Sequence, residues 1–199
     1  MEYLSNQKFC DHEGCSRIAL FLEERCAEHL LASGDYRAKI MQWAAAGRSL
    51  QGAHLENVNL EDVLLVAARL VGANLRHANL QGANLEGARL DGALLEQADL
   101  RRSRLRGAKM HLAILGGTLL DEADCEGADL RRANLGGARG WRARLQHSDL
   151  YYARLGAADF RIAHFGDSNI QRAIFRAANL EGASFRGARG TANFERALM

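Results

Sequence analysis

The sequence predicts an all-β solenoid, a chain that coils repeatedly through short extended segments joined by tight turns. Every fifth residue from Leu50 to Phe185 is large and apolar with few exceptions, and 20 of these 28 centre positions are Leu and four are Phe. Two residues before the centre the side chain is small, and Ala fills 21 of the 27 positions from Ala53 to Ala183. Two residues after the centre, Gly is the commonest residue. No insertion interrupts this five-residue register.

An extended chain explains this period, whereas a helix does not. On a helix of 3.6 residues per turn, a Leu at every fifth position would wind around the whole surface and leave no apolar stripe. In an extended segment, residues two apart share a face, so the small residue and the following Leu or Phe point inward together. The two remaining residues must then turn the chain, and Gly tolerates the backbone angles that tight turns require.

Charge spacing indicates how many five-residue units form one coil. A basic run is followed 20 residues later by an acidic one, so that Arg101, Arg102, Arg104, Arg106 and Lys109 correspond to Asp121, Glu122, Asp124, Glu126 and Asp129. Twenty residues further on, Arg142 and Arg144 correspond to Glu122 and Asp124. Opposite charges at this offset are neighbours if each coil contains four units. Seven coils at the usual strand spacing then give a rod of about 34 Å.

Three consecutive units carry a resemblance to a known family. Ala-Asn-Leu-Arg-His (73–77), Ala-Asn-Leu-Gln-Gly (78–82) and Ala-Asn-Leu-Glu-Gly (83–87) resemble the pentapeptide-repeat proteins, and the resemblance extends over residues 48–190. It implies a right-handed quadrilateral β-helix with a dry core of Leu, Phe and Ala. Two departures are local. Gly140 stands at a centre position before Trp141, where we expect a bulge or dent unless Trp141 or a neighbour fills the gap, and a one-residue slip follows Gly190.

Both ends of the rod need a cap, because a single coil buries too few side chains to offset the entropy of ordering its backbone. Residues 33–47 predict an N-terminal capping helix, with Ser33 or Asp35 as N-cap, Gly47 after the last turn and Trp43 over the first coil. Residues 191–199 contain Phe194, Leu198 and Met199. We expect this segment either to plug the last coil or to pair with a second copy, and the family resemblance favours a homodimer through this end.

Residues 1–32 predict a small zinc-binding module with the spacing Cys10-x4-Cys15-x10-Cys26-x2-His29. Cys26 and His29 project from one face of an expected helix, and Zn²⁺ takes four sulfur and nitrogen ligands in a tetrahedron. The pattern resembles zinc-ribbon and treble-clef modules. A structural rather than catalytic Zn²⁺ follows, because a catalytic ion keeps one position open. Alternatives are reduced buried cysteines, a disulfide, or His12 as fourth ligand. We expect Cys125, at a centre position, to be an inert core residue.

Composition and motifs narrow the class of protein. The chain has 199 residues, of which 48 % are apolar and 25 % charged, with a formal net charge of +2. It contains no stretch of about 20 apolar residues as a membrane helix needs, and its first residues lack a secretory signal, so we expect a cytoplasmic protein. No phosphate-binding loop and no cluster of catalytic side chains is present. The sequence therefore predicts a non-enzymatic binding or scaffold protein.

A side of the rod with little charge is the first candidate binding surface. A 20-residue coil places on one side Leu94, Ile114, Gly116, Gly117, Gly136, Gly137, Gly156, Ala157 and Ile174. On this side, Arg154 is the only charged residue between Ile114 and Ala157. A flat apolar surface lets another chain approach closely, which favours an unidentified protein partner. The alternative interpretation is that these small residues serve only as turn formers.

Two further functions compete with this one. Some pentapeptide-repeat proteins mimic DNA and bind type II topoisomerases such as gyrase, but mimicry needs an acidic surface, and residues 48–199 contain 21 basic against 17 acidic residues. The other alternative is nucleic-acid binding through a basic side of the rod with Tyr151 and Tyr152. Its basic residues are Arg69, Arg89, Lys109, Arg131, Arg132, Arg172 and Arg189, and Asp91, Asp129 and Asp149 interrupt them.

Overall fold

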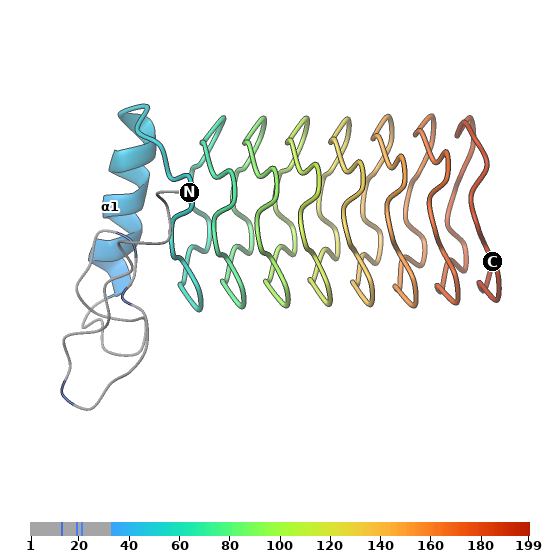
Figure 1. Ribbon diagram of the computed structural model, residues 1–199, viewed down its shortest axis with the longest axis horizontal. Coiled ribbons are helices and arrows are strands. Elements are labelled where there is room, and N and C mark those ends of the chain that lie inside the picture. The colour runs from blue at the N-terminus through green and yellow to red at the C-terminus, as the bar shows by residue number, and fades with distance from the viewer. Residues whose placement is uncertain (1–12, 14–18, 20, 22–32) are drawn as a thin grey trace, which may run out of the picture.

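Residues 48–199 form a straight rod of stacked coils, with a helix at one end (Figure 1). The computed structural model describes residues 13, 19, 21 and 33–199. Parallel β-bridges join residues that are 20 apart, beginning with His54 and Asn74, until the last two bridges, which join residues 19 apart. The offset of 20 confirms four units per coil. The shorter final offset confirms the one-residue slip after Gly190.

The coils are held together by the same main-chain hydrogen bonds in every unit. In the unit centred on Leu55, the Leu55 N–H donates to the carbonyl of Asn74 at 2.7 Å, and the Asn74 N–H donates to the carbonyl of Ala53 at 2.9 Å. The Ala53 N–H donates to Leu50 across the preceding turn at 3.1 Å. In each such unit, the bridge residue just before the centre is the one whose N–H and carbonyl both pair with the preceding coil. The described chain therefore contains isolated bridges rather than longer strands, because turns follow every three extended residues.

The second turn residue of almost every unit adopts the left-handed backbone conformation, whether or not it is Gly. Among the described residues, 18 that are not Gly have a positive φ, including Asn57 at 60° and Ile162 at 58°. Glycine is thus favoured at this position because it adopts the left-handed conformation without a steric penalty, but the repeat does not require glycine there. A β-branched residue such as Ile162 adopts these angles only where the surrounding structure enforces them.

The interior of the rod is dry and is filled by the centre residues and the small residues that precede them. Leu residues at the centre are almost fully buried, and so are their Ala neighbours. Four polar residues replace Ala in the core, and each hydroxyl donates to a main-chain carbonyl: Ser103, Ser148 and Ser168 at 2.7 Å, and Thr118 at 2.8 Å. Cys125 is buried as expected, and burial together with the charge of Asp124 raises the pKa of its thiol to about 12.

Gly140 leaves a gap in the core that a residue of the next coil fills. A Cβ atom built on Gly140 would lie 2.2 Å from Cε1 of Phe160, so the Phe160 ring occupies the space of the missing side chain. The Gly140 N–H still donates to Asp159 at 2.7 Å, and its carbonyl still accepts from Ala143 at 3.0 Å. The bulge or dent expected at Gly140 is therefore absent, because Phe160 restores the packing without any change in register.

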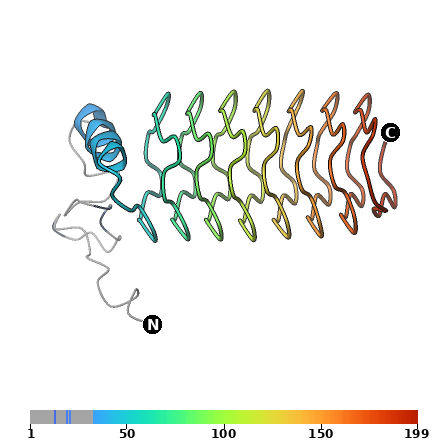
Figure 2. The ribbon, with the colours of Figure 1, turned by 90° about the horizontal axis from the view of Figure 1, so that it is seen from above.

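Helix α1 (Ser33–Ala45) lies across the first coil in both views (Figure 1, Figure 2). Tyr36 and Ile40 are buried in the same apolar cluster as the first centre residue, Leu50, and Trp43 is half-buried against it. Gly47 closes the helix with φ at 68°, and the N–H groups of Gly47 and Arg48 donate to the last helical turn. No described helix has the length and apolar character needed to span a bilayer.

The C-terminal segment continues the solenoid as part of an eighth coil. Asn193 and Leu198 form bridges to the preceding coil, and the Phe194 ring stacks on Phe175 with centroids 5.0 Å apart. Leu198 and Met199 are 57 % and 69 % exposed. The segment therefore covers the seventh coil, and pairing of this end with a second copy stays a prediction.

The packing of Phe160 against Gly140 predicts the effect of a double substitution. Gly140→Leu restores the usual centre residue but collides with Phe160, so we expect a loss of about 1–3 kcal/mol in the free energy of unfolding, as overpacked cores show. Phe160→Leu alone should also destabilise the protein, because it leaves a cavity beside Gly140. The double variant should recover most of both losses. Urea denaturation followed by circular dichroism measures all three, and a Gly140→Leu variant as stable as the wild type would contradict this packing.

Candidate functional site

The residues predicted to form the uncharged surface lie together on one side of the rod. This set, called the glycine strip below, contains Ile114, Gly116, Gly117, Gly136, Gly137, Gly156 and Ala157. Consecutive coils bring Gly116, Gly136 and Gly156 into one row, in which a Cβ atom on Gly116 or Gly136 would lie 3.8 Å from the carbonyl oxygen of the next glycine. The Gly117 N–H donates to Gly136 and the Gly137 N–H to Gly156, each at 3.0 Å. The row of glycines is therefore main chain without side chains of its own, and the exposed Arg154 lies on the same side of the rod.

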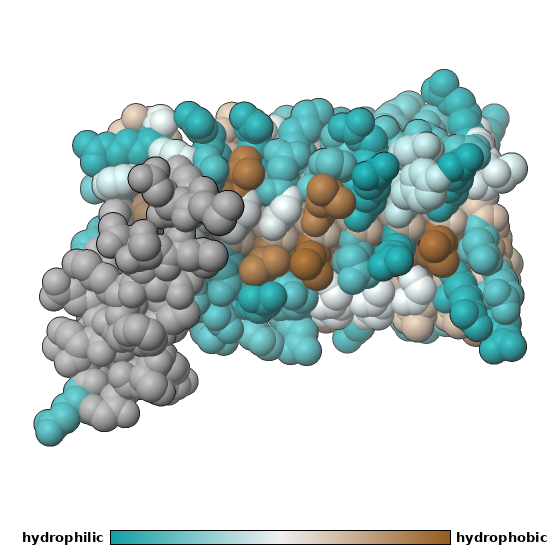
Figure 3. Space-filling view, viewed as in Figure 1, coloured by the Kyte–Doolittle hydropathy of each residue, from teal (hydrophilic) through white to brown (hydrophobic). Residues whose placement is uncertain are grey.

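Charged pairs border the glycine strip along the rod. On the N-terminal side, Arg76 pairs with Glu96 at 2.9 Å, and Glu96 extends over Gly116. On the C-terminal side, Arg176 pairs with Glu195 at 3.7 Å. Within the strip, Asn134 turns toward its own main chain, where its Oδ1 accepts from the Gly136 N–H at 3.2 Å. On the face of the rod drawn in Figure 3, hydrophobic residues lie in small patches among hydrophilic ones.

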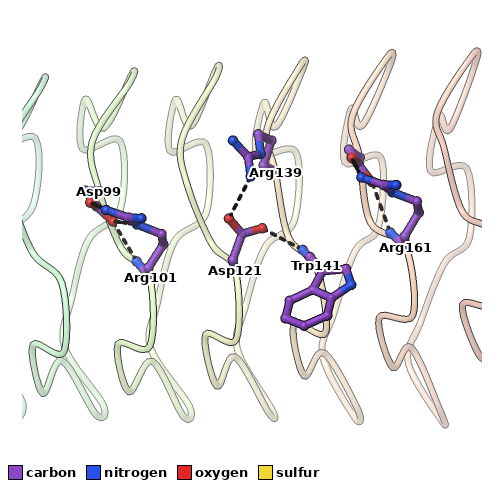
Figure 4. A network of polar contacts seen from close by, with 7 residues as sticks. Asp99, Arg101, Asp121, Arg139, Trp141 and Arg161 are labelled. Atoms are coloured by element: carbon purple, nitrogen blue, oxygen red, sulfur yellow. Dashed lines mark hydrogen bonds and ion pairs between the residues drawn. The ribbon is translucent and has the colours of Figure 1, made fainter.

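The next side of the rod carries an open hollow of about 530 Å³, which the sequence did not predict. Four successive coils contribute its lining, and we call it the Trp141 hollow. It is lined by Arg101, Arg102, Asp121, Glu122, Arg139, Trp141, Asp159 and Arg161. Figure 4 shows that carboxylates and guanidinium groups alternate along it, with the Trp141 ring among them.

The hollow coincides with a change in the bridge residues of this side. Most bridge residues here are Asn or Asp, and their side-chain oxygens accept the main-chain N–H two residues further on, as Asp99 does from Arg101 at 3.1 Å. Leu119 and Arg139 break this pattern in two adjacent coils. The Trp141 N–H instead donates to Asp121 of the preceding coil at 2.9 Å, and Arg139 also donates to Asp121 at 3.3 Å. Asp121 thereby fixes both neighbours.

Two of the arginines in the hollow are held by an Asp of their own unit. Arg101 donates to both oxygens of Asp99, and Arg161 donates to both oxygens of Asp159 at 2.8–2.9 Å. The hydrogen bonds from Arg161 hold the pKa of Asp159 below its ordinary value of 3.8. The sequence signal is Asp-Leu-Arg or Asp-Phe-Arg around the centre residue, and Asp129 and Arg131 repeat it elsewhere. This signal could have been found from the sequence.

The predicted ladder of opposite charges is correct in its offset and only partly correct in its pairs. Arg106 pairs with Glu126 at 2.9 Å and Arg144 with Asp124 at 3.7 Å, both across neighbouring coils. Within the described chain, Arg142 forms no ion pair with Glu122. Its guanidinium stacks on the Trp141 ring instead, 4.1 Å from the ring centre.

The basic side of the rod gathers its aromatic residues near one end. The Tyr151 and Tyr152 rings meet edge to face at 4.6 Å, and the guanidinium groups of Arg132 and Arg172 lie 6.0 and 5.1 Å from the Tyr152 ring centre. Arg131 on the same side is bound by Asp129 at 2.6 Å. Acidic partners therefore occupy part of the basic stripe that the nucleic-acid interpretation needs.

The predicted zinc ligands Cys10, Cys15, Cys26 and His29 lie outside the described residues. The zinc-binding module stays a prediction.

Comparison with protein families identifies the repeat. The family model of pentapeptide repeats matches in eight copies over residues 49–82, 78–117, 115–139, 123–161 and 158–189. The chain belongs to the pentapeptide repeat family. Pentapeptide repeat proteins form right-handed quadrilateral β-helices, and they are in general structural or interaction proteins without catalytic activity.

Solved structures similar to this pentapeptide repeat protein come from several sources. HetL, a protein of the cyanobacterium Nostoc involved in the regulation of heterocyst differentiation, is 29 % identical, with 76 % of this chain and 74 % of HetL covered and a TM-score of 0.39. A protein from the thylakoid lumen of Arabidopsis thaliana is 35 % identical over 48 % of this chain and 67 % of its own, with a TM-score of 0.48. The fluoroquinolone resistance protein QnrB1 is 15 % identical over 71 % and 85 %, with a TM-score of 0.38. No curated protein matches the chain.

Proposed function

We propose that this pentapeptide repeat protein is a non-enzymatic binding protein whose rigid rod presents the glycine strip to a protein partner. The observation that carries the proposal is the row of Gly116, Gly136 and Gly156, where partly exposed main chain continues over three coils and Glu96 extends over it only at Gly116. Another chain can approach such a surface closely. Because the hydrogen bonds between coils hold the rod in shape, binding requires little ordering of the surface, which favours affinity.

The strip is a better candidate than either alternative. A DNA mimic that binds a type II topoisomerase needs an acidic surface, whereas residues 48–199 carry four more basic than acidic residues. Nucleic-acid binding needs many free cations, whereas Asp129 and Asp149 both lie within 4 Å of Arg131 on the basic side.

The proposal predicts that a single protruding side chain in the strip abolishes partner binding. Gly136→Glu is suitable because Gly136 has no positive φ, and its new Cβ would meet only Asn134 Oδ1 at 3.3 Å and a carbonyl at 3.8 Å. We expect the variant to fold normally and to lose at least tenfold in retention of the partner. Affinity capture from cell lysate with immobilised wild-type and variant protein measures this.

A matched control is Gly166→Glu, which adds the same charge at the equivalent turn position on another side of the rod. It should retain the partner. If Gly136→Glu captures the same proteins as the wild type, the strip is not the binding surface.

We also propose that Cys10, Cys15, Cys26 and His29 bind one structural Zn²⁺. The support is the ligand spacing, together with the small size of the segment, since about 30 residues rarely fold without a metal or disulfide. Elemental analysis should give one zinc per chain, and none in the variant with both Cys15→Ser and Cys26→Ser. Cys125→Ala is the control, because Cys125 is a buried core residue and its loss should leave the zinc content unchanged. Full zinc content in the double variant would contradict the ligand assignment.

A further inference from the structure

The Trp141 hollow and its border, where Asp99 and Arg142 lie, contain five arginines and four carboxylates. Asp99, Asp121 and Asp159 each bind an arginine: Arg101 at 2.5 Å, Arg139 at 3.3 Å and Arg161 at 2.8 Å. Arg102 forms no ion pair with any described residue. Glu122 is the one carboxylate of the lining that also forms no ion pair with a described residue. Arg142 at the border also forms no ion pair with a described residue. Two arginines, Arg102 and Arg142, therefore remain unpaired against one carboxylate, Glu122. The hollow therefore has a local surplus of guanidinium groups.

Trp141 supplies an aromatic surface beside these charges. Its ring is half-buried and is held by the main-chain hydrogen bond to Asp121 and by stacking with Arg142. Its indole N–H has no acceptor within the described part of the chain. Ile162, which follows Arg161, is 43 % exposed although it is a large apolar residue. Trp and Arg, together with Tyr, are enriched among the side chains that dominate the binding energy of protein interfaces.

We propose that the Trp141 hollow binds an extended acidic segment of a partner protein, with a carboxylate on Arg102 and a large apolar side chain on Trp141. This inference rests on the proposed protein-binding function and adds to it the chemistry of one bound segment. Arginine binds a carboxylate through two parallel hydrogen bonds. Such a pair fixes the orientation of the bound carboxylate and also contributes binding energy. The indole N–H of Trp141 is available to a main-chain carbonyl of the same segment.

The charges of the hollow favour a peptide over a nucleic acid. Binding of a nucleic acid requires a continuous row of cations, because each neutralised phosphate contributes to affinity. Asp121, Glu122 and Asp159 interrupt any such row in the hollow. A peptide with one carboxylate needs only one guanidinium group. It can bind without placing negative charge beside the acidic side chains of the hollow.

The repeat also fixes the spacing of the two anchors in the bound segment. Arg102 and Trp141 belong to coils two apart, which corresponds to about 10 Å along the rod. A segment in the extended polyproline II conformation rises about 3.1 Å per residue and has three residues per turn, so residues three apart lie on the same side of the segment and about 9 Å apart. The segment should therefore carry its acidic residue three positions from its aromatic residue and lie along the rod axis.

Fluorescence anisotropy with a labelled ten-residue peptide tests the inference on the full-length protein. The probe contains one Glu and one Phe three residues apart among Ser and Gly residues. We expect saturable binding, weakened at least tenfold by Trp141→Ala and by Arg102→Gln, and strengthened several-fold by Glu122→Gln, which removes the competing carboxylate. A peptide with Gln in place of Glu, or with Glu and Phe adjacent, should bind at least tenfold more weakly.

Two protein controls separate this inference from the proposed function. Arg186→Gln removes an exposed arginine on another side of the rod and should leave peptide binding unchanged. Gly136→Glu should also leave it unchanged while abolishing capture of the partner through the strip. No binding of the probe, equal binding by Trp141→Ala, or binding of a single-stranded oligonucleotide that Trp141→Ala abolishes would each overturn the acidic-segment inference. The proposed role of the glycine strip is tested separately, by affinity capture with Gly136→Glu.

Discussion

Main-chain hydrogen bonds between successive coils place each residue over the one 20 positions before it, and all other features of the rod depend on this register. Each unit repeats the same bonds, as between Leu55 and Asn74 at 2.7 Å. These main-chain bonds form whatever the outward side chains are. For this reason Gly, Asn, Arg and even Ile162 occupy the same turn position with the same left-handed angles. The backbone determines the turn, and the side chain adapts to it.

This register divides the chain into a coupled interior and nearly independent sides. In the interior, residues of neighbouring coils share one continuous core, so that the absence of a side chain at Gly140 is compensated by Phe160 in the next coil. On the outside, one side can become smooth at Gly116, Gly136 and Gly156 while the next becomes hollow and charged around Trp141. A rigid rod can thus carry two unlike surfaces within the same coils.

The architecture was predictable from the sequence, whereas the conformations of long side chains were not. The Leu period and the charges 20 residues apart predicted the coil. The same 20-residue offset predicted which glycines share one side, because a glycine has no side-chain conformation to be predicted. Long side chains have several. Arg142 was expected opposite Glu122 and stacks on Trp141 instead. The Trp141 hollow went unnoticed because it depends on Asp121 accepting a main-chain N–H from another coil, and no local pattern encodes that bond.

The register itself is tested most directly by a pair of introduced cysteines. Asn84 and Arg104 form a parallel bridge, and neighbouring coils lie at about the strand spacing of 4.8 Å, within the Cα separation that a disulfide requires. Oxidation of the variant with Asn84→Cys and Arg104→Cys, followed by peptide mapping, should show a disulfide between these two residues. The variant with Asn84→Cys and Lys109→Cys, 25 residues apart, should show none. A disulfide at 25 residues and none at 20 would contradict the four-unit coil.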